Sequence, residues 1–125
     1  MIYGIGTDLV EPMRITCLLE RYGKRFAKRI LTNGEWPEFV SSGNPAMYLA
    51  KHFAAKEAFS KAMGTGFRHP VSLSHIGIIH DHLGKPYYEF HPELNVLIKN
   101  EGITSYHLSI SDEMSLACAF VVLEK

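Results

Sequence analysis

Hydrophobic and polar residues alternate over residues 2–10, with the sequence IYGIGTDLV, and this alternation predicts a β-strand. Because successive side chains of a strand point to opposite faces, Gly4, Gly6 and Asp8 share one face. Glycines inside a strand mark a place where a ligand or another backbone comes close. We therefore expect such a close approach beside Asp8. No third glycine follows at the spacing of a dinucleotide-binding fingerprint.

The next segment, residues 13–30, has apolar residues at the spacing of an α-helix. We predict one helix here, which Gly23 can bend or break. A short helix is predicted to begin at Thr32, because Thr32 and Glu35 form the pattern of a capping box. It ends before the loop at residues 41–43. The apolar stripe of the first helix comprises Ile15, Leu19, Tyr22, Phe26 and Ile30.

The clearest helix of the chain begins at Pro45 and runs to about Met63. Asn44 is a preferred N-cap residue, and proline suits the first helical position. Gly64 can adopt the left-handed conformation that commonly follows the last turn of a helix. The boundaries of this helix are therefore predicted at both ends.

The rest of the chain predicts two hairpins separated by a short helix. The predicted strands are residues 76–79, 86–90, 104–111 and 116–123, and the helix is 92–101. Tyr106, Leu108 and Ile110 are expected to face the core. This order of elements predicts an α+β fold, in which a mainly antiparallel sheet packs against the long central helix. We expect residues 1–125 to form a single domain.

Hydrophobic residues make up 46% of the 125 residues and charged residues 21%, values that exclude a disordered chain. The longest apolar run, Ala117–Leu123, is too short to cross a bilayer, and the first residues lack the pattern of a secretory signal. Cys17 and Cys118 lack metal-site spacing. We therefore expect reduced thiols, with Cys118 in the core, in a cytoplasmic protein.

Positive charge is concentrated in one segment, although the net charge of the chain is zero. Residues 14–29 contain six cations and one anion, a local charge of +5 that the rest of the chain balances. A solvated helix face usually mixes both signs, so this row favours a defined acidic partner. An acidic helical protein fits better than nucleic acid, because no recognition motif accompanies the row. The row comprises Arg14, Leu18, Arg21, Arg25 and Lys28.

Glu57 and Lys61 project from one stripe of the long helix, which we expect to be buried. The stripe also holds Ala46, Ala50 and Phe53. Glu57 and Lys61 can form a solvent-exposed pair, or they can line a cleft with a charged partner that offsets their desolvation. Asp8 supplies a second carboxylate. Carboxylates, water and phosphate oxygens are the ligands that Mg²⁺ prefers, and no His or Cys is needed.

Three further motifs are less specific. Gly64-Thr65-Gly66 is explained by an ordinary helix end, whose negative dipole disfavours a phosphate. His80-Asp81-His82 can place two imidazoles on one strand face, but it lies at a hairpin entrance rich in turn formers. We therefore expect no structural metal at this motif. Polar residues also end the strand before the last hairpin turn, where they are usually solvated: Ser109, Ser111 and Asp112.

Four segments of the chain occur together, in this order, in one family. They read IYGIGTDLVEPMRI at 2–15, LAKHFAAKEAFSKAMGTG at 49–66, LGKP at 83–86 and HLSISDEMSLACAFVVLE at 107–124. On these segments the chain resembles the holo-acyl-carrier-protein synthases, the small class of 4′-phosphopantetheinyl transferases. The resemblance implies transfer of phosphopantetheine from coenzyme A to a serine of apo-acyl carrier protein, a step in fatty acid biosynthesis that releases adenosine 3′,5′-bisphosphate.

The resemblance also implies roles for particular residues. Asp8 and Glu57 match Mg²⁺ ligands, Lys61 matches a lysine near the pyrophosphate, and all three would be catalytic. Glu57 is also our candidate for the base that activates the serine. The basic row would dock the acidic carrier protein. Coenzyme A would contact Lys61, Gly64, Thr65, Gly66, Lys85, Pro86 and Ser109. The family further implies a homotrimer whose active sites are shared between neighbouring subunits, with neither nucleic acid nor membrane as a partner.

Two positions depart from the family pattern. His52 stands where the family often has arginine, and Asp112 where it often has histidine. Both positions are associated with the nucleotide end of coenzyme A. Two other functions remain open at this point. One is a noncatalytic adaptor whose basic helix binds an acidic protein or RNA, and the other is a Mg²⁺ enzyme of the same superfamily that acts on a different carrier.

Overall fold

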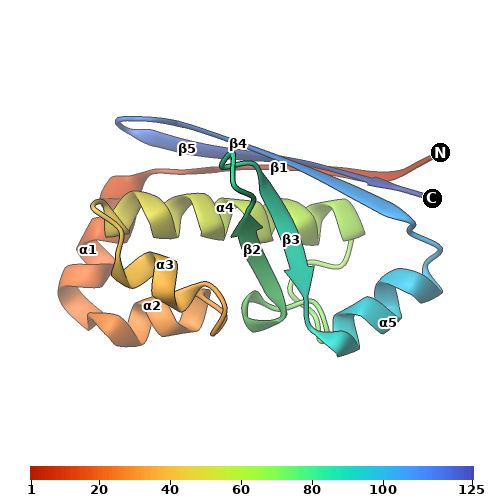
Figure 1. The fold of residues 1–125 in the computed structure, drawn as a ribbon, viewed down its shortest axis with the longest axis horizontal. Helices are drawn as coiled ribbons and strands as arrows, with labels where there is room; N and C mark the ends of the chain where they lie inside the picture. Colours follow the sequence, from red (N-terminus) through yellow and green to blue (C-terminus); the bar gives the residue numbers. More distant parts are fainter.

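The computed structural model describes residues 1–125 as two antiparallel sheets and a set of helices around α4. A three-stranded sheet, in the order β1-β5-β4, lies along α4, and the β2-β3 hairpin forms a second sheet (Figure 1). The elements in chain order are β1 (Ile2–Val10), α1 (Pro12–Tyr22), α2 (Lys24–Ile30), α3 (Trp36–Val40), α4 (Pro45–Met63), the 3₁₀ turn η1 (Leu73–His75), β2 (Ile76–His80), β3 (Pro86–Phe90), α5 (Pro92–Asn100), β4 (Ser105–Glu113) and β5 (Leu116–Glu124).

The predicted α+β architecture is confirmed, and so are both ends of the central helix. The Asn44 side chain accepts a hydrogen bond from the Met47 amide at 3.2 Å, and Gly64 adopts a left-handed conformation with φ of 78°. The Thr32–Glu35 capping box also forms, with its two bonds at 2.8 and 3.3 Å. The helix predicted to begin at Thr32 begins only at Trp36, because the box closes a turn that precedes α3. None of the helices combines the length and apolar character that a membrane crossing requires.

The helical pattern over residues 13–30 forms two helices that are divided at Gly23, one of the outcomes that this glycine allowed. Gly23 has φ of 62° and ψ of −144°, a conformation that residues with a β-carbon avoid, and it separates α1 from α2. The helical stripe is consequently interrupted. Ile15 and Ile30 are buried, but Tyr22 is 52% exposed because it stands at the break.

The burial of α4 also differs from the prediction. Two hydrophobic clusters pack against this helix, so that most of its circumference is covered. The stripe of Phe53, Glu57 and Lys61, which we expected to be buried, is instead the side that remains partly open. Ala50 on this stripe is buried, while Ala46 is only half-buried. An exposed ammonium and a half-buried carboxylate on an otherwise covered helix already indicate a cleft.

The last two strands agree with the predicted alternation in part. Leu108 and Ile110 pack against the core, whereas Tyr106 is 38% exposed and lies edge-on against Phe90. Cys118 is not a core residue, contrary to the prediction. Its β5 neighbours on both sides are fully buried, so the half-buried Cys118 belongs to the outer face of the sheet.

The backbone of β1 lies almost directly on the backbone of α4. A β-carbon added to Gly4 would lie 2.0 Å from the carbonyl oxygen of Ala62, and one added to Gly6 would lie 1.9 Å from that of Ala58. The close approach predicted beside Asp8 is thus confirmed, and its occupant is the central helix. This contact brings the following residue pair, Thr7 and Asp8, against the last turns of α4.

A buried lysine ties the other helices to α4. Lys56 is fully buried, and its ammonium donates to the Glu35 carboxylate at 2.6 Å. The same ammonium donates to the carbonyl oxygens of Ile30, at the end of α2, and of Leu73 in η1. The other oxygen of Glu35 meets Nδ1 of His52. These bonds satisfy the buried charges, and leaving either charge without its partner would be strongly unfavourable.

Replacing Gly6 with alanine should lower the free energy of unfolding by about 3 kcal/mol or more, because the space between the two backbones holds no β-carbon. Urea unfolding followed by the fluorescence of Trp36 measures this change. Gly43→Ala is the matched control, since nothing lies within 4 Å of its added β-carbon, and it should shift stability by less than about 0.5 kcal/mol. An unchanged midpoint for Gly6→Ala would contradict the close packing of β1 on α4.

Candidate active site

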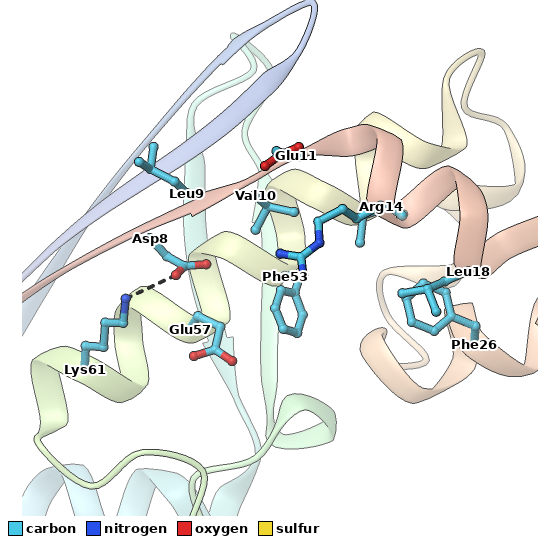
Figure 2. A pocket seen from close by; sticks show the side chains of 11 residues that line it. Asp8, Leu9, Val10, Glu11, Arg14, Leu18, Phe26, Phe53, Glu57 and Lys61 are labelled. Atoms are coloured by element: carbon cyan, nitrogen blue, oxygen red, sulfur yellow. Dashed lines mark hydrogen bonds and ion pairs between the residues drawn. The ribbon is translucent and has the colours of Figure 1, made fainter.

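A cleft of about 460 Å³ opens between the end of β1, helix α1 and the open side of α4. Asp8 enters it from β1, and Glu57 and Lys61 enter it from α4 (Figure 2). Arg14 extends from α1 toward Phe53 on the other side of this group. The two carboxylates predicted to converge therefore do line one cavity, although they come from distant parts of the chain.

Lys61 joins β1 to α4 at this cleft. Its ammonium donates to Oδ1 of Asp8 at 3.1 Å and to the carbonyl oxygen of Thr7 at 2.9 Å. The side chain of Asp8 is 16% exposed and that of Lys61 is 54% exposed, so the pair lies at the rim where solvent and a ligand have access. The last turn of α4 also favours a cation, because the helix dipole is negative there.

Glu57 titrates differently from an ordinary glutamate. Partial burial raises its pKa, the negative charge of Asp8 raises it further, and the ammonium of Lys61 opposes these two effects. Two carboxylates in one cleft repel each other unless a cation lies with them. The free protein therefore stores an electrostatic cost that a bound cation would relieve.

The donor set of the cleft fits Mg²⁺. Asp8 and Glu57 offer oxygen atoms, the ligands of a hard cation, and neither histidine nor cysteine lines the cavity. The cavity also leaves room for the water and phosphate oxygens that complete the coordination of Mg²⁺. The contact between the ammonium of Lys61 and the carboxylate of Asp8 shows that positive charge is accommodated at this place.

The predicted docking residues divide between two cavities. Arg14 and Leu18 line the first cleft, while Leu18, Arg25 and Lys28 line an adjoining one of about 690 Å³. Phe26 lines both cavities and, with Leu18, connects them. Arg21 lines neither, and its guanidinium lies 5.4 Å from the ring centre of Tyr22. The row predicted on one helix is therefore a surface formed by two helices.

The residues predicted to contact coenzyme A, other than Lys61, do not line the first cleft. Pro86 lines a separate cavity of about 280 Å³, together with His52 and Asp112, the two positions that depart from the family pattern. Lys51 lies in the same cavity, with its ammonium 3.7 Å from Asp112. The residues outside both cavities are Gly64, Thr65, Gly66, Lys85 and Ser109.

The buried partners Lys56 and Glu35 were missed by sequence reasoning. The signal was present, because Lys56 follows two alanines and stands on a helix whose apolar residues leave little surface for solvent. Glu35 was recognised only as part of the capping box. Its carboxylate oxygen Oε1 in fact accepts from both the Thr32 amide and Lys56, so that one residue caps a turn and neutralises a buried charge.

Comparison with known proteins assigns the chain to a family. The model of the 4′-phosphopantetheinyl transferase superfamily matches residues 4–121. The chain belongs to this superfamily. It is 73% identical to the holo-[acyl-carrier-protein] synthase of Nitrosospira multiformis and 59% identical to that of Nitrosomonas europaea, in each case over the full length of both chains. The resemblance seen in the sequence is thus confirmed, and with it the assignment to the transferases.

Solved structures of the superfamily agree with the model closely. The crystal structure of the holo-[acyl-carrier-protein] synthase from Neisseria meningitidis superposes with a TM-score of 0.97, at 54% identity and full coverage of both chains. The synthase from Helicobacter pylori, solved in complex with coenzyme A, gives a TM-score of 0.83 at 29% identity, covering 96% of this chain and 99% of that one. The arrangement of the transferase fold is therefore the same across these relatives.

Two substitutions should move the pKa of Glu57 in opposite directions in the metal-free protein. Asp8→Asn should lower it by removing a neighbouring anion, and Lys61→Met should raise it by removing a neighbouring cation. Titration of the Glu57 carboxyl carbon by NMR measures both shifts. Asp112→Asn serves as the control, because this residue lies in the other cavity and should leave the titration unchanged. Shifts of the same sign in the first two variants would contradict the proposed arrangement of charges.

Proposed function

We propose that this member of the superfamily transfers the 4′-phosphopantetheine group of coenzyme A to a serine of apo-acyl carrier protein in a Mg²⁺-dependent reaction, releasing adenosine 3′,5′-bisphosphate. The observation that carries the proposal is the convergence of Asp8, Glu57 and Lys61 on one cleft beside a basic surface. Phosphoryl-type transfer needs positioning and neutralisation of negative charge more than covalent catalysis. This arrangement supplies both.

Each residue of the cleft has a distinct part in the proposed reaction. Asp8 and Glu57 would hold Mg²⁺, and the bound ion would supply charge neutralisation and Lewis-acid polarisation of the phosphoryl group. Lys61 contacts the pyrophosphate and stabilises the charge that develops on the leaving phosphate. Glu57 accepts the proton of the serine hydroxyl. At the same time the serine oxygen bonds to phosphorus, and the bond between phosphorus and the leaving phosphate breaks.

The two-helix basic surface is the proposed docking site for the carrier protein. Arg14, Arg25 and Lys28 are exposed along it, and the half-buried Leu18 and Phe26 provide apolar contacts between them. Such a surface suits a helical protein with acidic side chains around an apolar stripe. The surface adjoins the cleft of Glu57, which brings the carrier serine near the reacting phosphate.

We further propose that the chain, as a cytoplasmic enzyme of fatty acid biosynthesis, forms a homotrimer in which neighbouring subunits complete each active site. Two features support it. The coenzyme A residues around Pro86 lie outside the cleft of Asp8 and Glu57 in a single chain. The outer face of the three-stranded sheet also carries exposed apolar side chains, namely Ile5, Leu9, Leu116 and Phe120. A second copy that covered this face would bury them.

Glu57→Gln should reduce the rate of transfer by about 100-fold or more, since it removes a Mg²⁺ ligand and the proposed base. The assay incubates the protein with coenzyme A, Mg²⁺ and apo-acyl carrier protein and records the carrier's mass. Glu93→Gln, an exposed change on α5, is the control. If the unmodified protein does not add phosphopantetheine to any carrier, the noncatalytic adaptor function is supported instead. If it modifies only other carriers, it is a Mg²⁺ enzyme of the same superfamily with a different carrier.

The same variant has a second expected result. The raised pKa of Glu57 means that its protonation favours the folded state, a contribution present below the ordinary glutamate pKa and lost as the pH rises through the raised value. The neutral amide of Glu57→Gln should therefore keep or increase the free energy of unfolding at neutral pH. A variant that is inactive because it is unfolded would contradict this.

Arg25→Glu should slow association with the carrier protein by about tenfold or more at low salt and make it less sensitive to salt. Stopped-flow binding to apo-acyl carrier protein at several salt concentrations measures both effects. Lys99→Glu on α5 makes the same change in net charge on another exposed helix. Equal effects of the two variants would show that overall charge, and not the two-helix surface, steers the partner.

A further inference from the structure

A cluster of metal-ligating side chains lies in the cavity that contains Pro86. Glu38 comes from α3, His52 from α4 and His80 from the end of β2. Each residue offers one ligand atom, and these atoms all lie within 4.8 Å of one another. All three residues line the same cavity of about 280 Å³. We propose that Glu38, His52 and His80 bind a divalent transition-metal ion, with Zn²⁺ as the best match. This proposal does not rest on the proposed transfer reaction.

His52 is held in the orientation of a metal ligand. The residue is 1% exposed, and its Nδ1 is bound to the carboxylate of Glu35, which is itself fixed by Lys56. The ring of Tyr48 stacks on the imidazole with 3.9 Å between ring centres. A histidine whose Nδ1 hydrogen is taken by a carboxylate presents Nε2 with its lone pair free. Carboxylates commonly support metal-binding histidines in this way.

His80 supplies a nitrogen that has no other partner. Its Nδ1 is buried and makes no hydrogen bond within the chain. This nitrogen lies 3.0 Å from Oε1 of Glu38, a distance typical of an ion pair, but the geometry of the two groups is not that of a hydrogen bond. Buried polar atoms are normally satisfied, so a close but unbonded nitrogen and carboxylate indicate a missing third participant. A cation bound by both groups at once would satisfy them.

The donor types select the class of ion. Two imidazole nitrogens and one carboxylate oxygen suit Zn²⁺ and similar transition metals, whereas Mg²⁺ prefers oxygen atoms alone. The cluster of Glu38, His52 and His80 is therefore chemically distinct from the cleft of Asp8 and Glu57. Three protein ligands leave a fourth position of Zn²⁺ for water or another ligand, and the cavity provides the space for it.

This assignment changes the interpretation of the His80-Asp81-His82 motif. The two histidines of the motif do not act together, because His82 is exposed and outside the cluster. The turn that seemed to argue against a metal is held by Asp81, whose carboxylate accepts from the amides of Leu83 and Lys85 at 2.8 and 2.9 Å. The partners of His80 come instead from α3 and α4, which no local spacing in the sequence reveals.

The test measures metal binding by the full chain after chelator treatment. Zn²⁺ uptake is followed by equilibrium dialysis, and Co²⁺ is used as a spectroscopic probe, because its visible bands report nitrogen and oxygen ligands in a low-coordinate site. We expect one ion per chain. Glu38→Ala and His80→Ala should each weaken Zn²⁺ binding by about 100-fold or more. Both side chains are partly exposed, at 50% and 28%, so neither change removes a core residue.

Two controls separate this cluster from other groups. His69→Ala alters the separate set of stacked histidines near α5, and Asp8→Asn alters the carboxylate cleft. Neither should change Zn²⁺ affinity or the Co²⁺ spectrum. The proposal is overturned if the chelator-treated chain takes up no Zn²⁺, or if its affinity survives in both Glu38→Ala and His80→Ala. Loss of Zn²⁺ binding in Asp8→Asn would likewise overturn it by assigning the ion to the other cleft.

Discussion

The contact between the backbones of β1 and α4 is the constraint on which the site depends. Without side chains at Gly4 and Gly6, the strand comes so near the helix that Asp8 reaches the level of Glu57 and Lys61. Any β-carbon there would push the strand outward and widen the distance between the carboxylates. The two glycines therefore determine the dimensions of a cleft to which they contribute no atom, since packed interiors transmit even small displacements.

Helix α4 places two different kinds of chemistry on adjacent lines of side chains. His52 and Lys56, one turn apart, face inward and share the carboxylate of Glu35. Glu57 and Lys61, five residues further along, face the open cleft. Because Lys56 also holds α2 and η1 through their carbonyl oxygens, the helix that carries the reactive groups is braced by its own neighbouring residues. Precise sites are built on such rigid elements.

Local signals in the sequence were sufficient for much of the fold. The caps of α4, the Thr32–Glu35 box and the order of strands follow from residue chemistry within a few positions, and the face of Asp8 follows from simple alternation. Gly23 was recognised as a place where the helix could bend or break. The open side of α4 could not be predicted, because it depends on which surfaces other elements cover. Burial of Lys56 likewise depends on carbonyl groups far away in the sequence. The cluster of Glu38, His52 and His80 could not be predicted either, because its members are far apart in the sequence and come together only in the folded chain.

The break at Gly23 gives the basic surface a bend. Helices α1 and α2 run in different directions on either side of it, so the cations occupy the two arms of a corner (Figure 1). A straight acidic helix of a partner can lie along α1 or along α2, but it contacts the other of the two only at its end. A partner that turns, with acids on two differently directed segments, can satisfy both arms together. Used as the proposed docking site, the surface would discriminate by shape among proteins of equal acidity.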